Sequence, residues 1–219
     1  EKLKKAKAEA KAKHQLYSQL TIDNSQKMNQ KITIPAFILM VLAQLYVPAS
    51  MIFQKERVIT QGTAYKFRTA PIDPNDPFRG KYITLSFNET GVKVENANEW
   101  NNTDEVFVFL TTDSSGYATI QSIAKEQPKG RNDYIKANID YIMTDTLSTV
   151  FVRYPFDRFY MEESKAPVAE TIYNEATIDS NQVAYALVMV MNGDAVVRDI
   201  FIDDVSITEI IRKEQNKVK

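Results

Sequence analysis

The longest uncharged stretch of the chain lies near its N-terminus, between Lys31 and Lys55. Residues 32–53 read ITIPAFILMVLAQLYVPASMIF and contain no charged side chain. A helix of this length rises about 33 Å, enough to cross a hydrocarbon core of about 30 Å. A buried core helix is the alternative, but such helices rarely continue so far without a charge. The pattern therefore predicts a transmembrane helix over residues 32–53.

Polar residues and prolines interrupt this span. Pro35 falls in the first turn, where a missing N–H costs little, and Pro48 could kink or finish the helix. Gln44 lies mid-span, where its amide favours a partner helix over lipid. The span therefore predicts an integral membrane protein as partner, with Gln44 as a candidate contact.

Beyond residue 63 the helical pattern gives way to alternation of apolar and polar residues. Turn signals at Asp113-Ser-Ser-Gly116 and Asn192-Gly193-Asp194 predict two hairpins. Residues 166–176 predict the one short helix, with Pro167 suited to its first turn. Together these features predict a mainly β fold, an antiparallel β sandwich or barrel with a short helix. The alternating or apolar runs predict about eight strands, at residues 63–69, 82–87, 106–110, 117–123, 134–143, 148–154, 183–191 and 195–205.

The predicted organisation has four parts: a basic head over residues 1–31, the span over 32–53, a linker over 54–62 and a β-rich domain over 63–219. The head is rich in Ala, Lys, Glu and Leu and predicts a helix that ends near residues 21–25. Basic segments beside a membrane bind anionic lipid headgroups. A topology signal with a solvated tail is the other interpretation of the head, and we favour it.

Charge predicts the orientation. Residues 1–31 carry eight lysines against three acidic residues, a net charge of +5. The whole chain has −1 and the span is uncharged, so residues 54–219 have −6. The positive-inside rule then predicts a single-pass inner (cytoplasmic) membrane protein whose C-terminal domain is extracytoplasmic or periplasmic. A signal peptide cleaved near Ala49 is the alternative. We favour an uncleaved anchor, because residues 1–31 alone are as long as a complete signal peptide of about 15–30 residues.

The composition removes most kinds of catalytic chemistry. The chain has no cysteine, and its one histidine, His14, lies in the head. Disulfides, thiolate sites, histidine metal sites and Ser-His-Asp triads are therefore unavailable to the domain. No phosphate-binding loop occurs, and the acidic domain without basic runs argues against nucleic acid. We therefore expect no cofactor, no metal, no catalytic residues and no enzyme activity.

The remaining catalytic possibility is a hydrolase that uses only Glu or Asp side chains, and we favour this class least. Glu162, Glu163 and Glu170 are close in sequence, but adjacent strand residues point to opposite faces. We interpret this segment as a structural loop in which Arg158 pairs with a carboxylate. Asp194, Asp203 and Asp204 lack the alternating ligand positions of a calcium loop, and we interpret them as turn and edge residues.

The densest unusual segment runs from residue 69 to residue 87. Asp73 and Asp76 each precede a proline, so the segment contains two turn starters in tandem. Gly80 gives backbone freedom just before the strand. The segment predicts a rigid loop that delivers Arg79 to the start of this strand. There we expect its guanidinium to bind carbonyls or the carboxylate of Asp73 or Asp76.

In this segment the chain resembles the GDYxxLxY protein family. The family's Gly, Tyr and Leu match Gly80, Tyr82 and Leu85, whereas its Asp is Lys81 and its last Tyr is Phe87. A second stretch, YPFDRFYMEE over residues 154–163, is similar to the family's aromatic-then-acid block. The resemblance covers roughly residues 32–205.

The resemblance implies a membrane-anchored bacterial envelope protein, often encoded near a polytopic membrane protein, with no assigned activity. Lys81 in place of the family's Asp weighs against a catalytic role at that position.

Three function classes remain. The favoured one is a non-catalytic subunit or accessory that docks on another membrane or envelope protein. The second is a ligand-binding envelope module with a groove near Arg79, Tyr82, Arg158 and Tyr160, which convergence of these four residues would support. The third is the Glu/Asp hydrolase, which two carboxylates facing one cleft would support.

Overall fold

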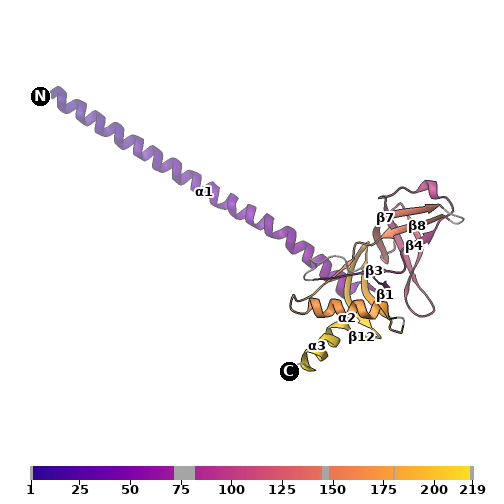
Figure 1. The fold of residues 1–219 in the computed structure, drawn as a ribbon. Helices are drawn as coiled ribbons and strands as arrows, with labels where there is room; N and C mark the ends of the chain where they lie inside the picture. The colour runs from indigo at the N-terminus through magenta and orange to yellow at the C-terminus, as the bar shows by residue number, and fades with distance from the viewer. Residues whose placement is uncertain (1, 72–81, 145–147, 180, 218–219) are drawn as a thin grey trace. The chain divides into compact units, whose positions relative to one another are not determined.

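The computed structural model describes residues 2–71, 82–144, 148–179 and 181–217 (Figure 1). The chain divides into two compact units, residues 1–53 and 54–219. The second unit contains every strand of the described residues and is mainly antiparallel β, so the expected fold class is confirmed.

The N-terminal helix α1 (Lys2–Gln61) is continuous. The expected end near residues 21–25 is wrong, and residues 54–61, expected as a linker, form the last turns of this helix. Polar residues such as Asp and Asn cost a helix less than about 0.7 kcal/mol each, so a few of them do not end it. Pro35 and Pro48 both lie inside α1. The segment Thr33–Gln61 is long and apolar enough to cross a membrane.

The end of α1 is attached to the β-rich unit. Val58 is buried, and Lys55 Nζ lies 2.8 Å from Asp194 Oδ1. Gly62 then turns the chain directly into the first strand, and its N–H donates to the Val58 carbonyl at 2.9 Å. A Cβ at this position would lie 2.5 Å from the same carbonyl oxygen, so the turn requires glycine.

The first sheet has the order β12-β11-β10-β1-β3. Its predicted hairpin forms, because Asn192 and Gly193 take positive φ of 54° and 89° between β10 and β11. The predicted strand over 195–205 is interrupted by a turn at Asp203 and Asp204, which also have positive φ. The strands are β1 (Thr63–Ala70), β3 (Ser86–Phe87), β10 (Ala184–Met191), β11 (Asp194–Ile202) and β12 (Val205–Ser206).

The second sheet has the order β4-β8-β7-β5-β6, and its end strands β4 and β6 lie near each other, so it curls toward a barrel. Its β5–β6 hairpin is the predicted one, with Asp113 Oδ1 accepting from the Ser115 and Tyr117 amides at 2.8 and 2.9 Å. A 3₁₀ turn, η1 (Ala97–Glu99), follows β4. The strands are β4 (Gly91–Lys93), β5 (Glu105–Thr112), β6 (Ala118–Ala124), β7 (Tyr134–Thr144) and β8 (Ser148–Arg153).

The two sheets share one hydrophobic core. Short parallel bridges join them at Lys66–Tyr117 and Ile135–Gly193. Alternate residues of both sheets point into the same cluster, as the period-two pattern predicts. Its fully buried members include Phe67, Ile83, Val106, Val108, Ile135, Val150, Val188 and Ile200.

Two helices pack on the strands of this unit (Figure 1). The helix α2 (Ala166–Ile178) packs against β10 of the first sheet and against β2 (Tyr82–Thr84), which lies outside that sheet, and α3 (Ile207–Lys217) packs against β11 and β12. The sequence predicted α2 but missed α3. Ile207 and Ile211 are buried in α3, and with Ile210 they have the i, i+3, i+4 spacing of an amphipathic helix. This isoleucine spacing is visible in the sequence, but charged residues surround it.

Tyr173 of α2 is fully buried, and its hydroxyl has no hydrogen-bond partner within the described part of the chain. Thr69 is the nearby polar side chain, but its hydroxyl donates to the Ala184 carbonyl at 3.0 Å. Burial raises the pKa of Tyr173 to about 12.

We expect Tyr173→Phe to leave stability unchanged or raise it by about 1 kcal/mol, because an unsatisfied buried hydroxyl is removed. Unfolded tyrosine ionises near pH 10, below the folded value, so the wild-type chain loses stability as pH rises from 10 toward 12. Part of that loss should disappear in the variant. Thermal unfolding at pH 7 and pH 11 checks both statements, and a loss of more than about 1 kcal/mol at pH 7 would mean that the hydroxyl is bonded.

Candidate functional site

The segment with the Gly-x-Tyr-x-x-Leu pattern connects the first sheet to a third sheet, which has two strands. Its β2 part pairs with β9 (Arg158–Tyr160), whereas its β3 part pairs with β1. The predicted alternation is confirmed. The side chains of Ile83, Leu85 and Phe87 are buried, and those of Tyr82, Thr84 and Ser86 are half-buried.

The aromatic stretch over residues 154–163 packs directly against this segment. Tyr82 stands opposite Tyr160 across the β2–β9 pair, and the Leu85 amide donates to the Asp157 carbonyl at 2.8 Å. Four rings then pack edge-on or stacked, with centroids 5.0–5.9 Å apart: Phe67, Phe87, Tyr154 and Phe156. Two segments about seventy residues apart in sequence therefore form one structural feature.

The outer side of the β2–β9 pair presents three of the predicted site residues together. The rings of Tyr82 and Tyr160 are 5.5 Å apart, and the Arg158 guanidinium carbon lies 5.0 Å from the Tyr82 ring centroid. Tyr160 is 65% exposed. The hydrogen bond that Arg158 donates to the Tyr160 hydroxyl, and then the charge of Asp157, raise the pKa of Arg158. We call these three side chains the Tyr-Arg face.

The other predicted residues have different positions. Asp73, Asp76, Arg79 and Gly80 lie outside the described residues, so the loop and the ion pairs expected for it are not described. Of the four residues expected around a groove, Tyr82, Arg158 and Tyr160 lie close together. Leu85 is a core residue rather than a surface one, and Gln44 is an exposed side chain of α1.

Glu162 has a structural position before α2. Its carboxylate accepts from Ser164 Oγ at 2.9 Å and lies 2.6 Å from Lys165 Nζ. The contact with Lys165, and to a smaller extent that with Ser164, lowers the pKa of Glu162. Arg158 instead lies 3.8 Å from the carboxylate of the adjacent Asp157. Because Glu162 is ion-paired in its charged form, it is unsuited to act as a general acid.

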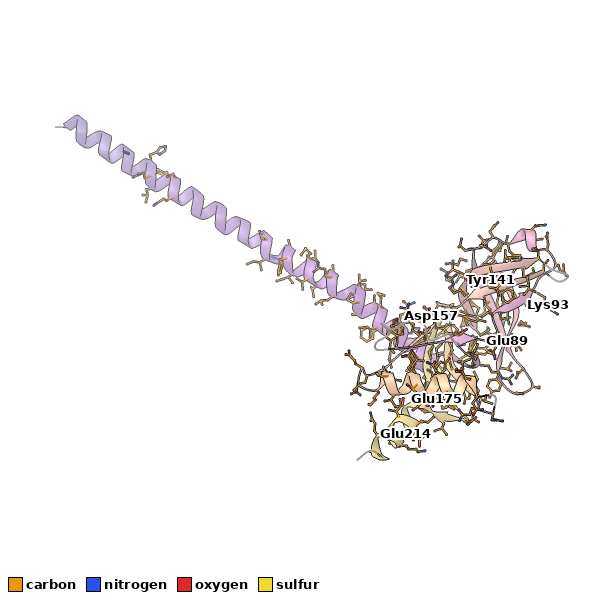
Figure 2. The ribbon with its side chains drawn as sticks, viewed as in Figure 1. Glu89, Lys93, Tyr141, Asp157, Glu175 and Glu214 are labelled. Atoms are coloured by element: carbon orange, nitrogen blue, oxygen red, sulfur yellow. The ribbon has the colours of Figure 1, made fainter. Side chains whose placement is uncertain are left out.

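A cleft of about 240 Å³ lies beside the Tyr-Arg face, on the side of Asp157. Ser86 and Asp157 line it from the two packed segments, and Thr90 lines it from just before β4. Asp140, Tyr141 and Arg153 line it from the β7–β8 hairpin. Figure 2 labels Tyr141 and Asp157, which come from these two parts of the unit. The sequence did not predict this cleft, because its walls come from three separate stretches of chain. We call it the Asp157 cleft.

Two carboxylates, Asp140 and Asp157, therefore line one cleft, which is the arrangement expected of the hydrolase class. Asp140, however, is ion-paired to Arg153. The hydrogen bond between these two side chains is the main reason that the pKa of Arg153 is raised. The ion pair occupies part of the Asp140 carboxylate. A glycosidase needs one carboxyl protonated as its general acid.

A family model described as GDYXXLXY protein matches residues 44–200. The chain belongs to the GDYxxLxY family. The expected family is therefore confirmed, over most of the chain. No curated protein and no solved structure matches it.

In this GDYxxLxY chain the motif residues fall into a buried group and a surface group. Leu85 and Phe87 fill the core, whereas Tyr82 reaches the surface as part of the Tyr-Arg face. The matched range contains that face and the Asp157 cleft and ends before α3. Both surface features therefore lie in the part of the chain that corresponds to the family.

Proposed function

We propose that the chain is a single-pass inner-membrane protein whose extracytoplasmic β domain binds another membrane or envelope protein without catalysis. The observation that supports this most is the Tyr-Arg face. The two packed segments place two tyrosines and an arginine side by side, with Tyr160 and Arg158 exposed and Tyr82 half-buried. Tyr and Arg are among the residues most enriched at the energetic centres of protein interfaces.

The apolar helix and the charge distribution support the location. The segment Thr33–Gln61 satisfies the length and composition of a membrane span. The head has a net charge of +5, which favours the cytoplasmic side. We expect a reporter enzyme that is active only in the cytoplasm to stay silent when fused after Lys219. A reporter that is active only outside the cytoplasm, fused at the same place, should give signal, and the reverse result would contradict the orientation.

The residue chemistry supports a role without turnover. The domain lacks cysteine and histidine. The carboxylates Glu162 and Asp140 are held in ion pairs. An activity abolished by Glu162→Gln or Asp157→Asn would contradict this part of the proposal.

The proposal requires a stable assembly. We expect the chain to leave native membranes in mild detergent, at native expression levels, as part of an assembly larger than its own 25.0 kDa. Chemical crosslinking in the membrane followed by co-purification should recover the same partner. Migration as a lone chain would count against the proposal.

Gln44 supplies a test within the span. We expect Gln44→Leu to weaken the assembly, because a hydrogen bond between membrane helices contributes about 0.6–2 kcal/mol. Met40→Leu, an apolar exchange in the same helix, is the matched control and should leave the assembly intact. Equal recovery of the partner with Gln44→Leu and with the control would mean that Gln44 faces lipid.

A further inference from the structure

We infer that the Asp157 cleft binds a neutral saccharide ring. The cleft lies beside the Tyr-Arg face, but it shares none of the three side chains of that face. This inference is therefore independent of the partner proposed above.

The polar groups of the cleft suit a ligand that both donates and accepts hydrogen bonds. Asp157 can accept, and the hydroxyls of Ser86 and Thr90 both donate and accept. Asp140 and Arg153 are paired with each other, but a carboxylate and a guanidinium each have further hydrogen-bonding positions beyond one such bond. Sugar hydroxyls are also donors and acceptors, and their bonds to charged side chains are stronger than those between neutral groups. The cleft therefore offers complementary partners to several hydroxyls of one ring.

Two aromatic residues on the wall of the cleft are suited to a sugar ring. Tyr141 and Phe151 stack with centroids 4.3 Å apart and planes 14° apart, and both line the cleft. Tyr141 remains 45% exposed. The C–H groups on one face of a pyranose pack on such an aromatic surface by dispersion and by attraction to its negative face. Hydroxyl partners and an aromatic platform are thus present in the same cleft.

Charge and size separate this ligand from other classes. Arg153 opposes a metal ion or an organic cation, and the two carboxylates oppose an anion. Among the residues that the structure describes, no group of three or more acidic or histidine side chains could hold a metal. The volume of about 240 Å³ lies below the usual 300–1,000 Å³ of sites for drug-sized molecules, which fits one ring or the end of a chain of rings.

Saturation-transfer NMR on the full chain in phosphatidylcholine nanodiscs tests this inference without sugar-based detergents. The probes are the methyl glycosides of glucose, galactose and N-acetylglucosamine. We expect saturation to reach the ring C–H protons of at least one probe. Asp157→Asn and Tyr141→Ala should each reduce the signal by about tenfold or more. Asp157→Asn keeps the backbone carbonyl that binds the Leu85 amide, so it should not disturb the fold.

Tyr160→Ala is the matched control, because it removes an exposed tyrosine of the Tyr-Arg face outside the cleft. It should keep the saccharide signal and lose the protein partner, whereas Tyr141→Ala should do the opposite, because Tyr141 stacks on Phe151 and is not part of the Tyr-Arg face. Failure of either proposal is thereby distinguishable from failure of the other. No transfer to any of the three glycosides, or a signal that neither Asp157→Asn nor Tyr141→Ala reduces, would overturn the inference.

Discussion

Replacing Phe67 with alanine should cost the β domain about 3–5 kcal/mol of unfolding free energy. Phe67 is 1% exposed, and its ring packs against Phe87, Tyr154 and Phe156 at 5.3–5.5 Å. It thus joins strand β1 to both segments that build the candidate site. A shortened side chain leaves a cavity between three rings that are already fixed by other contacts.

Thermal unfolding followed by the fluorescence of Trp100, the one tryptophan, measures this loss. For a domain of this size each kcal/mol lowers the midpoint by about 2–4 °C. The control is Tyr160→Ala, an aromatic-to-alanine change on the exposed face, which should stay within about 0.5 kcal/mol of wild type. If Phe67→Ala and the control unfold at the same temperature, the four-ring cluster is not a centre of stability.

Arg158→Ala and Tyr160→Ala should each weaken binding of the protein partner by about 2 kcal/mol or more, roughly thirtyfold. The two side chains lie together on the outer side of β9, and neither is needed to fill the core. Arg158→Lys keeps the charge but loses the planar group that faces the Tyr82 ring, so we expect an intermediate loss.

Recovery of the partner after crosslinking in native membranes checks this expectation. The matched control is Lys93→Ala, another exposed cation of the same domain, on strand β4. It should keep the partner at the wild-type level. Equal losses for Arg158→Ala and Lys93→Ala would point to general electrostatic attraction rather than to the Tyr-Arg face.

The sequence predicted those parts of the fold whose signals are local. Alternation predicted the strand over 63–69, a continuous apolar run predicted the one over 106–110, and the turn signal at Asn192-Gly193-Asp194 predicted the hairpin there. The short strands β4 and β9 were missed, because three residues are too few to show a period. The ends of α1 were also misplaced, since polar residues and prolines weaken a helix without always ending it.

The candidate site was predicted in part for the same reason. Tyr82, Arg158 and Tyr160 were chosen from two unusual stretches, and the β2–β9 pairing brings them together. Their exact partners depend on register, which no local pattern determines: Arg158 lies beside Asp157 and Tyr82, and Glu162 beside Lys165. The Asp157 cleft depends on the packing of a hairpin against both stretches, so it was visible only in the structure.

The central claim is that the Tyr-Arg face binds a protein partner, and a photo-crosslinking amino acid at position 160 tests it most directly. Irradiation of native membranes should give one defined crosslinked product from this position. The same group at Gln121, an exposed position of β6, should give none. A product of equal yield from both positions, or no product from position 160, would contradict the claim.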